Sequence, residues 1–475
     1  MSKQPDEPVN EAKRKLLVGS YPKKLYSPFL KHLRPYLAFD SGIRRILQSS
    51  GWLLGANTLA LGLKLLQTII LASALGVESY GVLTLILIFT LTLNEFLLSR
   101  AWETVIKFMT KYSAQGEQTK VRAIVKLGYL VDGVTGLAVF ILLIIAAEPA
   151  ANLLIGDPAA ESVLRISAVS VLLLIPIGTS SALLRVADRF DWIAFQSAGL
   201  ALLQLLTIAV ALALDLGIRG VVIASVITSA VDGLSMLYLA TTVSRVMGVV
   251  SVRSAHLRVL RADMNEIIRF AVPTNISGWF RLIQRRVDIL IIGYVLGPRE
   301  VGYYRIARSI TNMLGFAVFP LYVTSYPTFT RLWHKGQLRK LRNIALQMTG
   351  IASAVSLVGL VMILVFGALI IRNTVGAEYL PALNVIRWLG LGTAIASATV
   401  VGQPLLLAMG KAVHALVAIG AAALVQLAVL LILLPEFGIV AAGIAVLASY
   451  LVWTSVVVLG VKPLYRVEEY EPGYG

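Results

Sequence analysis

The chain contains no cysteine, and only 14% of its residues are charged, whereas a soluble protein carries about 25%. The absence of cysteine excludes a disulfide framework, a thiolate metal site and a cysteine nucleophile. The four histidines are scattered without metal-ligand spacing, so we expect no metal and no other cofactor. The phosphate loop G-x-x-x-x-G-K-[ST] and the nucleophile elbow G-x-S-x-G are also missing. These absences argue against an enzyme.

Apolar residues dominate what remains. The 475 residues are 57% hydrophobic, and the mean hydropathy is +0.81. Apolar runs of about 20 residues recur between residues 50 and 461, each long enough to cross a hydrocarbon core of about 30 Å. We count about twelve such segments. The sequence therefore predicts an all-α polytopic membrane protein.

The basic residues indicate how the chain is oriented in the membrane. The net charge is +17, which in a soluble protein would suggest a nucleic-acid partner, but here lysine and arginine are concentrated in alternate connections. Residues 1–48 hold ten of them and residues 148–160 hold none. By the positive-inside rule the basic connections face the cytoplasm. We expect a multi-pass protein of the cell membrane with both termini in the cytoplasm and no nucleic-acid partner.

The membrane-spanning part contains an internal repeat. Gly76 and Gly217 recur 221 residues later, in similar local sequence, as Gly297 and Gly438. Both copies begin inside and hold six segments, which predicts two six-helix lobes related by an axis along the membrane normal. The predicted parts are a basic tail (1–48), an N-lobe (49–241), a cytoplasmic linker (242–266), a C-lobe (267–461) and a C-terminal tail (462–475).

Basic residues at membrane depth are the candidate binding site, because an ionisable group there is costly and is functional by default. Lys64 and Arg285 occupy equivalent positions in the two copies. Arginine suits phosphate because its guanidinium donates in a bidentate fork. The candidates for binding a diphosphate or an anionic glycan are Lys64, Arg165, Arg281, Arg285, Arg305, Arg308 and Arg387. Few acids at depth balance them, which predicts a positively charged space between the lobes.

Asp288 is the acidic candidate, for an ion pair or for coupling to an ion. At about 100° per residue, Arg281, Arg285 and Asp288 share one face of the helix, and Arg286 points elsewhere. Asp288 lies three residues after Arg285 and is equally well explained as its ion-pair partner.

Two further groups of charged residues have a plainer explanation. Arg165 and Arg305 lie near helix ends and are as well explained by snorkelling to the interface. Glu95, near the cytoplasmic mouth, is expected to pair with Arg100 or Lys107.

A set of short motifs in order resembles the oligosaccharide/polysaccharide flippases of the multidrug/oligosaccharidyl-lipid/polysaccharide (MOP) transporter superfamily. The resemblance covers about residues 45–460. The motifs are Leu75-Gly76 with Tyr80-Gly81, Pro273, Asp288, Leu296-Gly297, the stretch 301–307, Gly410-Lys411 and the stretch 435–439.

The resemblance implies a MOP-type fold and a flippase. Its cargo would be a polyprenyl-diphosphate-linked oligosaccharide, moved from the inner to the outer leaflet by alternating access, with Lys64, Arg281 and Arg285 holding the diphosphate. Membrane lipids, and a glycan polymerase or glycosyltransferases of the same pathway, are the further partners expected. Two alternatives stay open: a cation-coupled exporter of small molecules of the multidrug type, and a membrane glycan polymerase or ligase.

Overall fold

The computed structural model describes residues 41–97, 101–249 and 252–466. The described residues from Trp52 onward form one compact unit, and the helix contacts described below lie within it. Most of the predicted tail at 1–48, and residues 467–475 of the predicted tail at 462–475, lie outside the described residues.

The described residues fold into helices and contain no β-strand. The first half comprises α2 (Ser41–Leu97), α3 (Ala101–Ala114), α4 (Gln118–Ala150), the π-turn η3 (Ala151–Ile155), α5 (Ala160–Leu174), α6 (Ile177–Val186), α7 (Phe190–Ala213) and α8 (Gly217–Val246). The connection to the second half holds the short 3₁₀ helices η4 (Val252–Ser254) and η5 (Leu257–Asp263).

The second half repeats this pattern with one interruption in its first helix. It comprises α9 (Met264–Leu282), the π-turn η6 (Ile283–Val287), α10 (Asp288–Leu296), α11 (Pro298–His334), α12 (Leu338–Thr374), the short η7 (Ala377–Tyr379), α13 (Ala382–Ala398), α14 (Gly402–Ala408), α15 (Ala412–Phe437) and α16 (Val440–Arg466).

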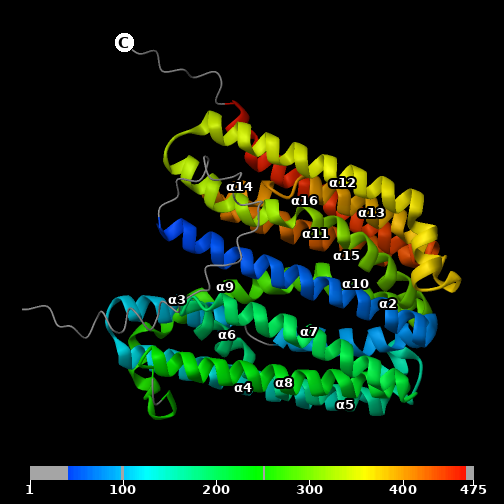
Figure 1. Ribbon diagram of the computed structural model, residues 1–475, viewed down its shortest axis with the longest axis horizontal. Coiled ribbons are helices and arrows are strands. Elements are labelled where there is room, and N and C mark those ends of the chain that lie inside the picture. Colours follow the sequence, from blue (N-terminus) through cyan, green and yellow to red (C-terminus); the bar gives the residue numbers. More distant parts are fainter. Residues whose placement is uncertain (1–40, 98–100, 250–251, 467–475) are drawn as a thin grey trace, which may run out of the picture. The chain divides into compact units, whose positions relative to one another are not determined.

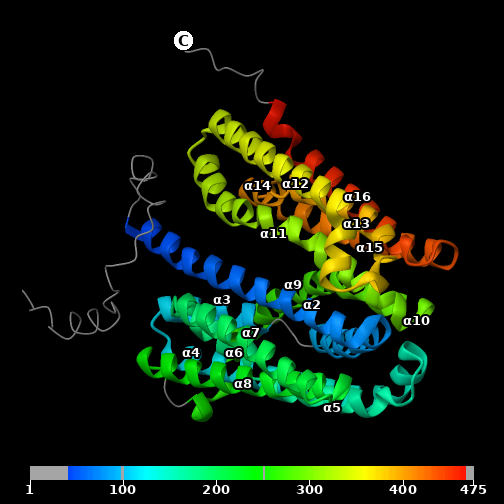
Figure 2. The same cartoon turned by 45° about the vertical axis from the view of Figure 1, so that its right-hand side comes forward.

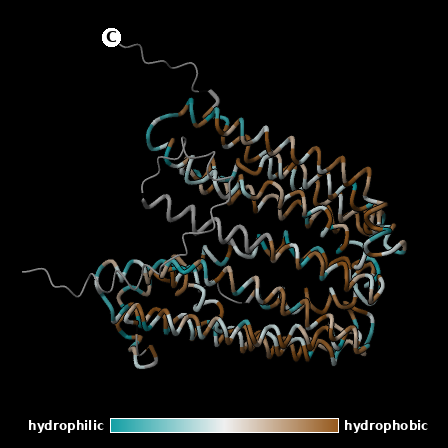
Figure 3. Tube along the Cα trace, in the orientation of Figure 1, coloured by the Kyte–Doolittle hydropathy of each residue, from teal (hydrophilic) through white to brown (hydrophobic). Residues whose placement is uncertain are grey.

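Ten helices in the described part are long and apolar enough to cross a membrane. The first of them, Leu59–Phe96, turns back at Gly76 and is therefore two spans. The segment from α9 to α10 supplies the remaining span, which is less apolar than the others because it carries several charged residues. Figure 3 shows the hydrophobic colouring along these helices. The structure thus has the twelve predicted helices.

The helices pack as two bundles. In the first, α5 contacts α4 and α8, and α7 packs on α8; in the second, α11, α12, α13 and α16 pack on one another and α15 packs on α16. Figures 1 and 2 show these two groups from two directions. The predicted all-α fold of two six-helix lobes is confirmed.

The two lobes meet where their first helices turn, at Gly76 and Gly297. These glycines adopt nearly the same left-handed conformation, with φ 73° and ψ 171° at Gly76 and φ 87° and ψ 177° at Gly297. A Cβ on Gly81 would lie 1.8 Å from the carbonyl oxygen of Pro298, and one on Gly302 would lie 2.4 Å from that of Val77. Because Gly302 and Pro298 are the repeat counterparts of Gly81 and Val77, the contact is reciprocal.

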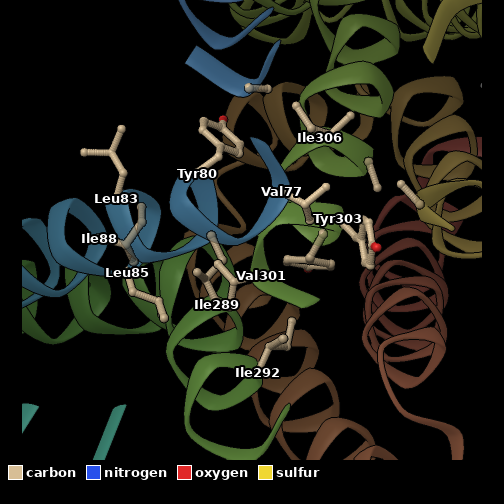
Figure 4. Packing of buried hydrophobic residues seen from close by; sticks show 14 of the residues in the cluster. Val77, Tyr80, Leu83, Leu85, Ile88, Ile289, Ile292, Val301, Tyr303 and Ile306 are labelled. Carbon is tan, nitrogen blue, oxygen red and sulfur yellow. The ribbon is translucent and has the colours of Figure 1, made fainter. Parts of the chain in front are cut away.

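The reciprocal contact of Gly81 with Pro298 and of Gly302 with Val77 is here called the glycine seam. Large buried side chains surround it. Tyr80 and Val301, which are repeat counterparts, are both buried in one apolar cluster that includes helices of both lobes. Figure 4 shows them beside Val77 and Tyr303. Tyr379, fully buried, donates a hydrogen bond of 3.0 Å to the carbonyl oxygen of Ala72 in the other lobe. The lobes are therefore packed tightly at this end.

At the opposite end of the bundles, the linker holds the start of α9 against the first lobe. Asp263 accepts hydrogen bonds from Lys120 and from the Tyr112 hydroxyl, both at 3.0 Å. Lys111 pairs with Glu266 at 2.6 Å. The hydrogen bond from Lys120 is the main reason why the pKa of Asp263 lies below its ordinary value.

We expect Gly81→Ala to weaken the glycine seam, since its methyl group would overlap the Pro298 carbonyl. The cost of such overpacking is about 1–3 kcal/mol, and it would appear as a lower melting temperature of the purified protein. Gly62→Ala is the matched control, because no atom lies within 4 Å of its added Cβ. Alanine favours a helix by about 1 kcal/mol over glycine, so a loss of stability in the control would contradict this explanation.

We expect Asp263→Asn to lower stability at neutral pH by up to about 1 kcal/mol, because the ion pair is partly exposed. A carboxyl whose folded-state pKa is depressed stabilises the fold above its unfolded pKa of about 4, and the contribution is lost as the pH falls through the lower folded-state value. Melting temperatures of wild type and variant should therefore converge in acid. Asp188→Asn, which removes a carboxylate from an exposed turn, is the control and should leave the melting temperature at neutral pH unchanged.

Candidate functional site

The candidate site is built on the interruption between α9 and α10. Over η6 the chain makes a π-turn, which inserts one residue into the helical repeat. The carbonyl oxygen of Gln284 accepts hydrogen bonds from two side chains, that of Arg308 at 2.9 Å and that of Gln426 at 3.4 Å. Side chains of α11 and α15 therefore stabilise the π-turn by hydrogen bonds.

Asp288, the first residue of α10, lies at the centre of these contacts and is only 3% exposed. It forms an ion pair with Arg308, and it accepts hydrogen bonds from the Tyr304 hydroxyl at 2.5 Å and from Gln426 at 3.3 Å. The expected pairing of Asp288 with Arg285 is wrong, because the π-turn rotates Asp288 toward α11. Arg308, predicted to bind cargo, has its charge neutralised within the C-lobe.

Arg286, which the sequence did not single out, contacts the other lobe. It donates to the Glu95 carboxylate on α2 at 2.8 Å. A second contact lies beside the first: Trp279 donates its indole N–H to the Phe96 carbonyl at 2.9 Å, and the two rings stack at 5.2 Å. The expected pairing of Glu95 with Lys107 is wrong, because Glu95 pairs with Arg286 and Lys107 lies over the ring of Phe270 at 4.0 Å. Arg100, the other expected partner, lies outside the described residues.

Two further guanidinium groups, those of Arg285 and Arg305, lie within electrostatic reach of Arg286, and their charges repel it. Among the described residues, Glu95 is the carboxylate that pairs with this group. Three positive charges and one negative charge leave a net charge of +2. One nitrogen of Arg286, Nη1, is buried and has no hydrogen-bond partner in the described part of the chain.

The remaining predicted cations lie on four different helices. Lys64 is exposed on α2, and Asp232 of α8 is within electrostatic reach of it. Arg165 pairs with Glu161 one turn earlier at 2.5 Å, on an exposed stretch of α5. Arg281 is half-buried in the last turn of α9, and Arg387 is exposed near the start of α13.

The N-lobe holds two acids at depth, contrary to the expectation that almost none balance the cations. Asp132, 1% exposed, accepts from the backbone N–H of Thr179 at 2.9 Å and from its hydroxyl at 2.7 Å. It thereby caps α6, whose first N–H groups are free because the helix begins after Pro176. Asp232 accepts from Gln196 at 2.6 Å.

No three histidine, aspartate or glutamate side chains gather to form a metal site within the described ranges. The site is therefore a cluster of hydrogen-bond donors with surplus positive charge. Such a cluster suits an anion.

We expect Asp288→Ala to destabilise the protein by about 3–5 kcal/mol, because it leaves the guanidinium of Arg308 buried without an anionic partner. Arg285→Gln, exposed in the adjacent turn, should leave the melting temperature unchanged. Similar losses in both variants would show that Arg285 is structural and not a binding residue.

Comparisons with known proteins agree with this architecture. A family model described as "Polysaccharide biosynthesis protein" matches residues 46–333. The chain is 24% identical over 354 residues to the inner membrane protein YghQ of Escherichia coli (strain K12), covering 73% of this chain and 97% of that protein.

Solved structures share the fold at low sequence identity. The lipid II flippase MurJ in an inward closed conformation matches with a TM-score of 0.68 and 14% identity, over 86% of each chain. An inward-facing multidrug resistance MATE family transporter of the MOP superfamily matches with a TM-score of 0.67 and 15% identity, over 88% of this chain and 96% of that one. The expected MOP-type fold is confirmed.

Proposed function

Since the chain belongs to the polysaccharide biosynthesis protein family, we propose that it is a flippase for a polyprenyl-diphosphate-linked oligosaccharide. The observation that carries the proposal is the surplus charge of the cluster formed by Arg285, Arg286, Arg305 and Glu95. A diphosphate near −2 matches its net charge of +2. The forked guanidinium groups also match the geometry of phosphate oxygens.

Energetics favour a role in binding for these cations over a place against lipid. A basic side chain at the centre of the bilayer costs about 2.5–3.5 kcal/mol on insertion scales. Arg285 and Lys64 are exposed on their helices, and this cost favours a position that faces a water-filled space between the lobes over one against lipid. Lys64 and Arg281 would hold the diphosphate together with Arg285, while Arg165 and Arg387 would attract the anionic glycan. Arg308 instead supports the site through Asp288.

The glycine seam supports a cycle of alternating access. With both termini in the cytoplasm of a cell-membrane protein, the seam lies at the outer end, and the site is reached from the inner leaflet. The headgroup enters there while its lipid tail stays in the bilayer. Rocking of the lobes then exposes the headgroup outside. An inside-negative potential favours this direction by about 4–5 kcal/mol per 100 mV for two negative charges.

Two other functions make different demands. A cation-coupled exporter of small molecules would use acids inside a lobe, and Asp132 and Asp232 are the observation in its favour. A membrane glycan polymerase or ligase would lose activity on substitution of an outer-loop residue and not of Arg285. A polymerase or glycosyltransferases of the same pathway fit better as partners that consume or supply the cargo, alongside the membrane lipids.

The proposal is tested in liposomes that contain a fluorescent polyprenyl-diphosphate oligosaccharide, by the accessibility of the glycan to an impermeant glycosidase. We expect wild type to flip it. The double variant Arg281→Ala/Arg285→Ala should lose at least about tenfold in rate, since each lost charge-assisted contact costs about 1.5–3 kcal/mol.

Arg339→Ala, which removes an exposed cation from the first turn of α12 outside the proposed site, is the control and should keep most of the rate. Equal rates in wild type and the double variant would contradict the proposed site. Protection of cells against cationic dyes, without flipping of any lipid-linked glycan, would favour the exporter.

A further inference from the structure

The contact between Glu95 and Arg286 joins the two lobes inside the proposed binding site. Glu95 lies near the end of α2 in the first lobe, and Arg286 lies in the π-turn of the second. Their side chains are 191 residues apart in the chain and 2.8 Å apart in space. The stacked pair of Phe96 and Trp279 continues the same contact. The end of α2 is therefore held against α9 and η6.

The contact with Glu95 satisfies only part of the hydrogen-bonding capacity of Arg286. One of its terminal nitrogens donates to the carboxylate, whereas the other is buried without a partner in the described structure. A single carboxylate thus leaves part of the guanidinium fork free. The positive charges of Arg285 and Arg305 also remain next to it. An anion with more oxygens and a second negative charge would satisfy the group better than Glu95 does.

We propose that Glu95 is an internal stand-in for the cargo, and that a diphosphate displaces it from Arg286 and so releases α2 from η6. This inference rests on the proposed function. Arg286 becomes a ligand of the diphosphate together with Arg285, and the ion pair with Glu95, one of the contacts between α9–η6 and the first lobe, is lost only when cargo is bound. Binding of the anion thereby triggers the movement that carries it.

The exposed fractions of the two side chains indicate that Glu95 can be left without its partner at low cost in free energy, whereas Arg286 cannot. The Glu95 side chain is 44% exposed, so once released it is solvated by water. The Arg286 side chain is 20% exposed and lies beside two other cations. A vacant Arg286 would be costly, because a desolvated cation would repel its neighbours without compensation. The arginine therefore always has an anion, either Glu95 or the cargo.

The test compares wild type with Glu95→Gln, which keeps the size of the side chain and removes its charge. The probe is farnesyl diphosphate, a short isoprenoid diphosphate, titrated into the full chain in detergent. We expect the variant to bind it about fivefold to tenfold tighter than wild type, since the competing ion pair is gone. Glu148→Gln, an exposed acid on α4, is the matched control and should bind like wild type.

A second measurement reports the movement itself. Because the chain has no cysteine, spin labels are placed directly by Leu91→Cys on α2 and Ile276→Cys on α9. Both positions are exposed, Leu91 about one turn before Glu95 and Ile276 about one turn before Trp279 of the stacked pair. We expect the distance between the labels to increase when the probe is added to wild type. In Glu95→Gln the longer distance should already be populated without the probe.

The outcomes distinguish the proposed diphosphate site from the proposed role of Glu95. If farnesyl diphosphate binds neither wild type nor variant, both the diphosphate site and the role of Glu95 are overturned. If wild type binds it but Glu95→Gln binds no tighter and keeps the short distance between the labels, the proposed function survives and the stand-in role is wrong.

Discussion

The buried ion pair between Asp288 and Arg308 determines what the rest of the site does. It neutralises one cation and one anion inside the C-lobe, where an unpaired charge would cost several kcal/mol. The same guanidinium also donates to the carbonyl oxygen of Gln284 in the π-turn. With Asp288 held toward α11, Arg285 and Arg286 are left without a partner on their own helix. One pair thus stabilises the turn and keeps the carboxylate of Asp288 away from Arg285 and Arg286.

The two lobes use equivalent positions for different purposes. The repeat counterpart of Asp288 is Gln67, which is also buried and donates to the carbonyl oxygen of Ala201 at 2.8 Å. An uncharged amide there needs no counter-ion, and the N-lobe has no π-turn at the corresponding place in α2. Its acid lies elsewhere, at Asp132, where the break before α6 exposes free N–H groups. The C-lobe therefore holds a group of arginines with surplus positive charge, whereas the N-lobe holds two acids whose hydrogen bonds come from uncharged groups.

The sequence was sufficient for the fold because apolar length and the repeat at Gly76 and Gly297 are local signals. The site was predictable only in part. Counting 100° per residue places Asp288 beside Arg285, and that count fails wherever a π-turn adds a residue. Nothing near Arg286 in the sequence indicates Glu95, since their pairing depends on how the lobes pack. Asp132 was missed for the same reason, as its partner is the start of another helix.

The glycine seam is related to itself by a half-turn. Gly81 packs against Pro298 and Gly302 packs against Val77, so each lobe offers the same patch to the other, as two identical subunits do across an isologous dimer interface. In a true dimer every substitution at such an interface occurs twice and must suit both sides. Joining the copies in one chain removes that constraint. Proline now stands in one copy where valine stands in the other, while both glycines, which allow the close approach, remain.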